Sequence, residues 1–528
     1  MRCRELCSAP IPVLSPCPLE EARRFLILTG LEACVVAQGD NIYGLLERRT
    51  LEHALRFGLE VDTCELVQPD IPLVEGDVEA TPAVLNSLLR NPTRRAIVCK
   101  ERRPFGLLSA EDLLREGLSL SRPALFSVHL PSFLKKLAEV VYELSLELKL
   151  RAYLVGGAVR DLLLGRLFYD VDLIVTGNLE AFASRFASQI GAKRVKSSLF
   201  GTVKFRRGDW EIDVAQCRWE YYEAPGALPH TAPGPLEDDL FRRDFTLNAM
   251  ALSLSPPHLG RLFDLFGGQT DLQRRCLRVH HPLSFVDDPT RLFRAARYMS
   301  RLGLNPSPGT MKARDLALKL GVLHRLSPAR LRQEFVRILQ EDHPEKALFC
   351  LQELKVLEAL VPSASALLSA LSYIVQQDLP EETRLEALAL LLARKRKELA
   401  AFLVPSPKRF EHLCASWAAL KREEGFLRSP RPLSEKVFFL EKFPLPVLLA
   451  QAAERKEGRV LLERCLKEYF SLSPHLSGER LKEKGVPPGP LLGEMLKKLR
   501  AARLDGLVKS EEDEWALLRK EYPHVFLT

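Results

Sequence analysis

The sequence predicts an α+β protein of several domains, with an N-terminal α/β module, a mixed α/β head and an all-α C-terminal body and tail. Its 528 residues exceed what one hydrophobic core normally supports, so three or four domains are expected. Strand and helix patterns alternate up to about residue 305, and Leu- and Ala-rich helical patterns with charged faces follow. The expected domains cover residues 1–125, 135–275, 276–365 and 366–528.

The first of these segments contains a weak internal repeat of strand, turn, strand and helix. One copy has strand patterns within residues 33–46 and a helix from Thr50, and the other has them within residues 96–108 and a helix from Glu111. The repeat predicts two copies of one small α/β unit.

Residues 153–161 (YLVGGAVRD) join a short strand pattern to a helical pattern through two glycines. A helix N-terminus presents free backbone N–H groups, and glycine lets the backbone approach a phosphate closely. Gly156, Gly157 and Arg160 are therefore candidate phosphate-binding residues. A Gly-Gly pair alone is more often a plain turn, so the prediction depends on the segment that follows.

That segment, residues 169–175 (YDVDLIV), has the pattern of a strand, whose period of two sends Asp170 and Asp172 to the same face. Neighbouring carboxylates repel each other unless a cation joins them, and hard oxygen ligands suit Mg²⁺. A two-ion site could activate a 3′-hydroxyl and hold a leaving pyrophosphate. A further strand pattern at residues 210–215 could bring Asp213 alongside; the alternative is a solvated strand end.

Three ordered motifs resemble those of class II tRNA nucleotidyltransferases and bacterial poly(A) polymerases. They lie at residues 154–177, 242–251 (RRDFTLNAMA) and 287–297 (DDPTRLFRAAR). The resemblance is dense over residues 150–305, continues more weakly through the helical remainder and does not include the N-terminal repeat. It implies a polymerase-β-like nucleotidyltransferase head, followed by a helical base-selecting neck and a tRNA-binding body and tail.

The resemblance also implies roles for individual residues. Asp170, Asp172 and Asp213 would be catalytic, the first two as ligands of the Mg²⁺ ions. The residues expected to bind the nucleotide are Gly156, Gly157, Arg160, Arg242, Arg243, Asp244, Asn248, Asp288, Arg291 and Arg294. Guanidinium groups suit phosphate, and a carboxylate can accept a hydrogen bond from a ribose hydroxyl.

Asp288 and Arg291 are expected to share one helix face and to read the base together. Cytosine and adenine both present an amino donor beside a ring-nitrogen acceptor, so a carboxylate and a guanidinium would accept C and A and mismatch U and G. The family usually has Glu where this chain has Asp287, which is one carbon shorter. The alternative is an ordinary helix start with an acidic first turn.

The N-terminal repeat resembles a tandem cystathionine-β-synthase-type (CBS) pair, a module that often binds adenosine nucleotides. The second copy keeps residues 109–112 (SAED), where Asp112 would hold a ribose, whereas the first copy has Thr50 at the equivalent position. A structural or RNA-positioning role is the alternative to nucleotide sensing.

Composition agrees with a polyanionic partner. The net charge is +8, and the last segment carries basic side chains that could contact phosphates of a tRNA acceptor and TψC stem. These are Lys482, Lys484, Lys497, Lys498, Arg500 and Arg503. Because acidic residues are interleaved with them, a solvated face is the alternative.

The eleven cysteines are scattered without a Cys-x-x-Cys pair, which favours reduced thiols in a cytoplasm. No run of eighteen apolar residues predicts a membrane span.

The combined motifs predict template-independent transfer of AMP and CMP from ATP and CTP to the 3′ end of tRNA, either C and A or the terminal A alone. A poly(A) polymerase is the nearest alternative, since it can share every head motif. A nucleotide-sensing RNA-binding protein without catalysis is the alternative of another class.

Overall fold

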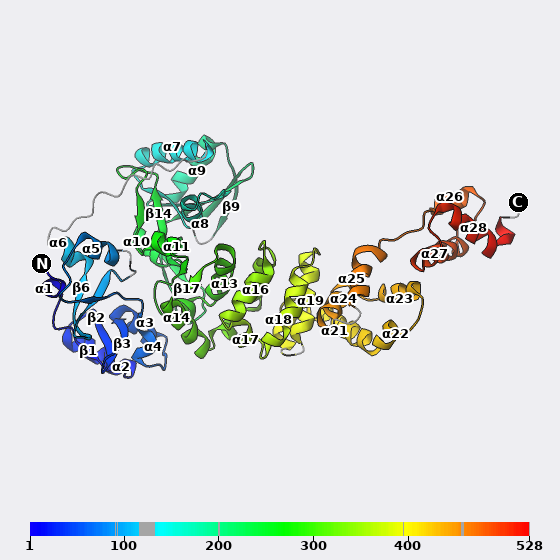
Figure 1. Cartoon of the computed structure of the whole chain (residues 1–528). Helices are drawn as coiled ribbons and strands as arrows, with labels where there is room; N and C mark the ends of the chain where they lie inside the picture. The colour runs from blue at the N-terminus through cyan, green and yellow to red at the C-terminus, as the bar shows by residue number, and fades with distance from the viewer. Residues whose placement is uncertain are drawn as a thin grey trace. The chain divides into compact units, whose positions relative to one another are not determined.

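The computed structural model divides into two compact units, Met1–Leu326 and Ser327–Thr528 (Figure 1). The described residues are 1–89, 91, 93–115, 132–198, 201–393, 395, 397–455 and 459–526. The expected boundary at residue 125 lies outside them. The first unit contains the N-terminal module, the head and the first helices of the expected neck.

The N-terminal module confirms the internal repeat. In each copy a short strand pairs in parallel with a second strand, which pairs antiparallel with a third, and the register shifts once in both copies, at Val36/Ala37 and at Val98/Cys99. The strands are β1 (Val13–Leu14), β2 (Ala33–Gln38), β3 (Asn41–Glu47), β4 (Leu73–Glu75), β5 (Arg95–Lys100) and β6 (Arg103–Ser109). The two- and three-residue strands β1 and β4 gave no sequence signal.

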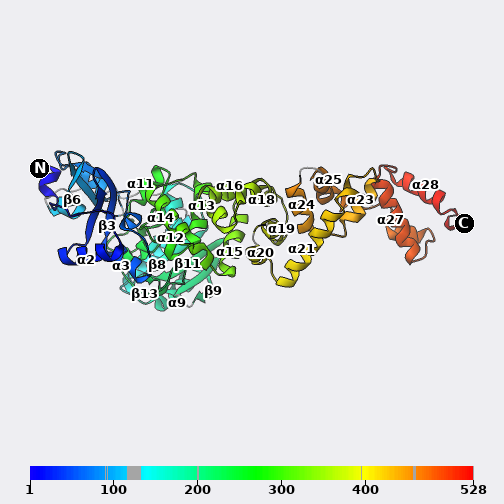
Figure 2. The same ribbon diagram turned by 90° about the horizontal axis from the view of Figure 1, so that it is seen from below.

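Helices pack around both small sheets of the module. They are α1 (Cys3–Leu6), α2 (Leu19–Thr29), α3 (Arg48–Arg56), α4 (Thr63–Leu66), α5 (Pro82–Leu89) and α6 (Ala110–Arg115). Val35 and Leu45 of the first copy share one core with Ile97 of the second copy, so the copies form a single body. Helix α3 lies on the side of this body beside the head (Figure 2).

The head is built on a mixed seven-stranded sheet in which β8 and β11 are parallel and the other neighbours antiparallel. In sheet order the strands are β15 (Leu262–Asp264), β14 (Met250–Ser253), β7 (Ala152–Val155), β8 (Asp170–Val175), β11 (Trp210–Gln216), β10 (Thr202–Arg207) and β9 (Lys193–Ser198). A separate hairpin of β12 (Arg218–Tyr221) and β13 (His230–Pro233) follows β11.

The two faces of this sheet have different coverings. Helices α7 (Ser132–Glu147) and α9 (Leu179–Ile190) lie over one face and bury Val171 and Leu173 of β8 (Figure 1). The opposite face packs Ile174 against α10 (Leu236–Phe241). Because strand residues alternate between faces, the even-numbered residues of β8 point to the α10 side.

The end of the first unit is helical apart from one short strand pair. It contains α11 (Gly268–Gln273), β16 (Cys276–Leu277), α12 (Ser284–Asp287), α13 (Thr290–Leu302), β17 (Asn305–Pro306) and α14 (Pro308–Lys319). Helix α14 starts with a Ser-Pro pair: the Ser307 side chain accepts a hydrogen bond from the backbone N–H of Thr310, and proline occupies the first turn.

The second unit has no strand among its described residues, which agrees with the expected all-α body and tail. Its α-helices are α15 (Pro328–Leu339), α16 (Pro344–Glu353), α17 (Val356–Leu360), α18 (Leu368–Val375), α19 (Glu381–Ala393), α20 (Lys397–Ala401), α21 (Pro407–Arg422), α22 (Glu424–Arg428), α23 (Leu433–Leu440), α24 (Leu445–Glu454), α25 (Arg459–Arg464), α26 (Gly478–Glu483), α27 (Pro490–Leu504) and α28 (Glu511–Glu521). The last three share a core of their own around Leu481, Met495 and Leu518.

Throughout the described part of the chain, every helix is too short or too polar to span a bilayer.

Gly268, at the start of α11, faces the backbone of Thr246. A Cβ added there would lie 2.2 Å from the Thr246 carbonyl oxygen, so one of the two segments would have to move. We expect Gly268→Ala to lower the free energy of unfolding by about 1–3 kcal/mol, as overpacking does, measured by urea denaturation. Gly493→Ala is the control, because a Cβ there meets nothing within 4 Å; it should stabilise α27 by up to about 1 kcal/mol. Equal effects of the two changes would contradict this prediction.

Candidate active site

The three candidate carboxylates lie on one face of the head sheet. Asp170 and Asp172 of β8 point to the α10 side, and the parallel pairing of β8 with β11 sets Asp213 directly beside Asp172. The expected shared face of Asp170 and Asp172 is confirmed, as is the position of Asp213 alongside them.

The charges of these carboxylates are only partly compensated. Burial raises the pKa of Asp172, and so do Asp213 and Asp170, whereas the Arg243 guanidinium lowers it. Lys204 of β10 donates a hydrogen bond to Asp213 at 2.6 Å, and this contact raises the pKa of the lysine. In the described residues no three Asp, Glu, His or Cys side chains are gathered closely enough to form a metal-binding cluster. Asp170 and Asp172 are the residues that could hold a cation here.

Gly156 brings the glycine motif against these carboxylates. Its φ of 67° is a left-handed conformation that favours glycine. A Cβ at this position would lie 2.9 Å from Arg243 Nη1 and 3.2 Å from Asp172 Oδ2. The backbone therefore passes directly between a guanidinium and a carboxylate, and Gly157 begins α8 (Gly157–Leu163).

Four further candidate residues form one hydrogen-bonded chain. Arg160 donates to Asn248 at 2.9 Å, and the Asn248 amide donates to Asp244 at 2.9 Å. Arg294 of α13 donates to the second oxygen of Asp244 at 2.7 Å. The chain therefore connects the glycine motif, the double-arginine motif and the neck helix.

Asp244 stays ionised at the centre of this chain. Burial opposes ionisation, but Arg294 and Asn248 outweigh it and lower the pKa of the carboxyl from 3.8 to about 2. Both guanidinium groups also lie over the ring of Tyr298, at 5.2 Å for Arg160 and 5.6 Å for Arg294. The sequence pattern did not identify Tyr298; its position four residues after Arg294 on one helix is the signal that could have done so.

The double arginine is held by a buried acid that sequence reasoning missed. Asp239 of α10 accepts from Arg242 at 2.7 Å and from Arg243 at 2.9 Å. Burial raises the pKa of Asp239, but the two arginines overcome this and lower it. Arg242 also donates to Glu220, so it faces the β12–β13 hairpin, whereas Arg243 lies beside Gly156. The available signal was the acidic run at residues 237–239, whose last residue, Asp239, lies three positions before Arg242 and four before Arg243.

Asp288 does not lie on the helix of Arg291, which corrects the expectation of a shared helix face. Helix α13 begins at Thr290, and Asp288 is extended with φ −135° and ψ 97°. The following Pro289 disfavours helical geometry at this position. The Asp288 carboxylate instead accepts from the backbone N–H of Thr290 at 3.0 Å and from its hydroxyl at 2.7 Å.

Arg291 is buried and held in place. Its guanidinium donates to the Ser284 hydroxyl at 2.8 Å and to the Arg242 carbonyl at 2.7 Å. Through the second bond, the base-selecting candidate on the neck is fixed to the double-arginine motif of the head.

Asp287 has an unexpected neighbour from the N-terminal module. It lines a cleft of about 310 Å³ with Arg291, and His53 of α3 reaches to within 3.3 Å of its Oδ1. Burial raises the pKa of Asp287 to about 7, and burial lowers the pKa of His53 to about 4. Between these values both side chains are neutral, so the contact is not an ion pair. Sequence reasoning missed His53, since nothing local connects it to a residue more than 200 positions away.

The buried carboxyl of Asp287 should make stability depend on pH. Its folded pKa of about 7 lies above the ordinary 3.8, so its contribution to stability is complete below pH 4 and is lost as pH rises through 7. Asp287→Asn removes the titration while keeping the shape. We expect the melting temperature of the variant, relative to the unsubstituted protein, to be higher at pH 8 than at pH 5 by roughly 5–10 °C. The two pH units between 5 and 7 correspond to about 2.7 kcal/mol, and about 1 kcal/mol shifts a large domain by about 2–4 °C.

The matched control is Asp209→Asn, at an exposed turn of the same head. The difference in melting temperature between this variant and the unsubstituted protein should be the same at pH 5 and at pH 8. A relative melting temperature of Asp287→Asn that does not change with pH would refute the prediction.

Residues 152–278 match the family described as the Poly A polymerase head domain, and residues 313–368 match the family described as a probable RNA and SrmB-binding site of polymerase A. Two solved structures of CCA-adding enzymes are similar over 75% of this chain and 97% of the matched chain. The Thermotoga maritima enzyme complexed with tRNA has a TM-score of 0.60 at 27% identity, and a complex with ATP has a TM-score of 0.59 at 27% identity.

Three curated relatives are aligned over most of this chain. The A-adding tRNA nucleotidyltransferase of Geobacter sulfurreducens is 30% identical over 97% of the chain, which spans 63% of that relative's length. The A-adding enzyme of Halalkalibacterium halodurans is 30% identical over 77% of the chain and 96% of its own length. The CC-adding enzyme of Deinococcus radiodurans is 32% identical over 69% of the chain and 88% of its own length. The chain therefore belongs to the tRNA nucleotidyltransferase family.

Proposed function

We propose that this protein transfers AMP and CMP from ATP and CTP to the 3′ end of tRNA without a nucleic-acid template. The observation that carries the proposal is the chain of bonds from Arg160 through Asn248 and Asp244 to Arg294, because it joins the glycine motif, which lies against the carboxylates of the head, to the neck. The names of the relatives support the same activity.

In the proposed reaction, the 3′-oxygen of the RNA forms a bond to the α-phosphorus of the nucleotide. The bond from this phosphorus to the oxygen that bridges to the β-phosphorus breaks, pyrophosphate leaves, and the hydroxyl proton passes to solvent. Gly156, Gly157 and Arg160 would hold the triphosphate, with Arg243 beside them. Asp244 and Asn248 would contact the ribose.

Asp170 and Asp172 would hold two Mg²⁺ ions. The donor set fits, because both carboxylates lie on one face and the raised pKa of Asp172 reflects burial and repulsion that a cation would relieve. Bound Mg²⁺ would favour ionisation of the 3′-hydroxyl and neutralise charge on the pyrophosphate.

Arg291 and Asp288 would select the base. Both side chains are already held by hydrogen bonds within the neck and to the head, so they would meet a nucleotide in a fixed arrangement. A carboxylate acceptor beside a guanidinium donor suits the shared edge of cytosine and adenine. In the narrower form of this proposal, the enzyme adds only the terminal A.

The tail would bind the tRNA acceptor and TψC stem with fewer basic residues than expected. Arg500 donates to the carbonyl of Leu472 at 2.7 Å and pairs with Glu441. Arg503 donates to the carbonyl of Ser473. These two guanidinium groups therefore make contacts within the second unit. Lys482 and Lys484 are exposed and remain candidates for phosphate contacts.

We also propose that the N-terminal repeat is a CBS-type pair that takes an adenosine nucleotide. The matching strand topology of its two copies supports this. Asp112, expected to hold the ribose, accepts hydrogen bonds from the backbone N–H and hydroxyl of Ser109 through its Oδ2. A cytoplasmic location is part of the proposal, since all eleven cysteines are unpaired.

The poly(A) polymerase alternative is favoured by one specific observation, the match of residues 152–278 to the Poly A polymerase head domain. The test is incorporation of labelled CTP and ATP into tRNA transcripts that end before the CCA, after one C and after two Cs. Addition of C and A to all three transcripts would mean a complete CCA enzyme. Addition of A only after two Cs would mean an A-adding enzyme, and long A tails would mean a poly(A) polymerase.

Asp172→Ala should lower transfer at least about 100-fold while tRNA binding persists, because it removes a carboxylate expected at the reacting phosphate. Asp209→Ala, at an exposed turn of the same sheet, is the control and should be fully active. Failure of the unsubstituted protein to incorporate either nucleotide would leave the non-catalytic alternative.

A further inference from the structure

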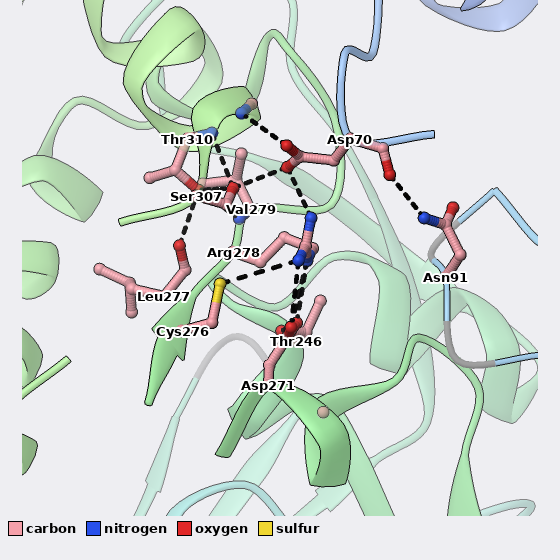
Figure 3. A network of polar contacts seen from close by, with 12 residues as sticks. Asp70, Asn91, Thr246, Asp271, Cys276, Leu277, Arg278, Val279, Ser307 and Thr310 are labelled. Atoms are coloured by element: carbon pink, nitrogen blue, oxygen red, sulfur yellow. Dashed lines mark hydrogen bonds and ion pairs between the residues drawn. The ribbon is translucent and has the colours of Figure 1, made fainter. Parts of the chain in front are cut away.

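Asp70 of the N-terminal module is buried in a polar network that belongs to the head and neck (Figure 3). Its Oδ2 forms an ion pair with Arg278 Nη1 at 2.6 Å and accepts a hydrogen bond from the Ser307 hydroxyl at 2.7 Å. Its Oδ1 accepts from the backbone N–H of Gly309 at 3.1 Å. One carboxylate thus contacts two segments, around Arg278 and at residues 307–309, that are more than 200 residues away in the sequence.

On the head side, the network reaches the double-arginine motif. Arg278 donates to Asp271 Oδ2 at 3.0 Å, and Asp271 accepts from the Thr246 hydroxyl at 2.6 Å (Figure 3). Thr246 lies between Asp244 and Asn248, the two residues proposed to contact the ribose. Asp70 is therefore two side chains away from a nucleotide-binding segment.

On the neck side, the network fixes the start of α14. The Ser307 hydroxyl that donates to Asp70 also accepts from Thr310 N–H at 3.1 Å, and the Thr310 hydroxyl donates to the Leu277 carbonyl at 2.9 Å. A Cβ at Gly309 would lie 2.6 Å from Asp70 Oδ2, so the start of α14 and the segment that carries Asp70 are tightly packed here. Helix α14 in turn packs against α12, which carries Ser284, the partner of Arg291.

A second contact from the module reaches the same neck. His53 of α3 lies against Asp287, Arg49 lies over the ring of Phe241 at 4.5 Å, and Arg56 lies over the ring of Tyr221 at 5.3 Å. The module therefore touches the hairpin, α10 and the residue next to Asp288, in addition to the start of α14.

These contacts are directional, and the Asp70 side chain is only 5% exposed. A carboxylate that accepts two hydrogen bonds and pairs with a guanidinium defines the positions of its partners, because charge-assisted contacts are short and lose strength when misaligned. Removing one partner of a buried charged pair leaves the other without compensation. Through Arg278, the Asp70 network therefore resists relative movement of the head segment around Asp271 and the neck segment around Ser307.

We infer that Asp70 is a positioning residue for nucleotide choice: it fixes the neck that carries Arg291 against the head that carries Asp170 and Asp172. This inference rests on the proposed function. It makes the N-terminal module part of the selection of the base, in addition to any ligand that it binds. Loosening the network should let the neck accept bases with the wrong edge pattern, since misplacement by about 1 Å is costly for a positioned reactant.

The test compares kcat/KM for ATP and for UTP on a tRNA transcript ending in two Cs, with the full chain. Asp70→Asn keeps the shape but removes the charge. We expect its kcat/KM for ATP to fall on the order of 10-fold to 100-fold, and the ATP-to-UTP ratio to fall about 10-fold. Asp77→Asn is the control, because Asp77 is an exposed acid of the same module that pairs with Arg2 and Arg4.

Ser307→Ala keeps the test decisive if Asp70→Asn fails to fold, because it leaves every charge in place. We expect its ATP-to-UTP ratio to fall roughly 3-fold to 10-fold, the effect of one hydrogen bond. Ser327→Ala is its control, since Ser327 caps α15 with the same Ser-Pro start and accepts from Arg330 N–H. Its ratio should stay at the value of the unsubstituted protein.

The outcomes separate the two proposals. A fall in the ratio for Asp70→Asn or Ser307→Ala, with both controls unchanged, supports the inference. An equal loss for ATP and UTP in both variants, accompanied by a lower melting temperature, would mean a purely structural role and would overturn it. An unsubstituted protein that incorporates no nucleotide would overturn the proposed function, and the inference with it.

Discussion

The active-site region depends on pairing buried carboxylates with guanidinium groups from distant segments. Asp244 is held ionised by Arg294 of the neck, and Asp239 holds both arginines that follow it, Arg242 and Arg243. A buried charge without a partner is costly, so these pairs form together or not at all. The glycine motif, the carboxylate strands and the neck are consequently joined through side chains whose charges require one another.

Sequence reasoning succeeded where the determinant is local. The period of two in residues 170–175 predicted the common face of Asp170 and Asp172, and the Gly156–Gly157 pair marked the junction of strand and helix, where Gly156 has a φ of 67°. The internal repeat was also visible, because each copy forms its own small sheet. The helices of the second unit followed from their Leu- and Ala-rich patterns with proline breaks.

It failed where a partner comes from far away or where a neighbour changes the backbone. Pro289 excluded Asp288 from the helix of Arg291, a local effect that outweighed helical spacing. Tyr298 gains its importance from its contact with Arg160, made across the fold, whereas Asp239 was missed although Arg242 and Arg243 are only three and four positions away. The contacts of His53 and Asp70 join segments separated by more than 200 residues, and no periodicity encodes such a meeting.

The two copies of the N-terminal module carry opposite charges at one equivalent position, Arg49 and Glu111. After β3 the chain continues with Arg48 and Arg49, and after β6 with Ala110 and Glu111. The basic helix of the first copy reaches the neck and the hairpin, whereas the second copy uses Asp112 to cap its own acidic helix start. Both copies thus contact the rest of the first unit, the first through a basic helix and the second through Arg94, which donates to the Leu265 carbonyl at 3.4 Å.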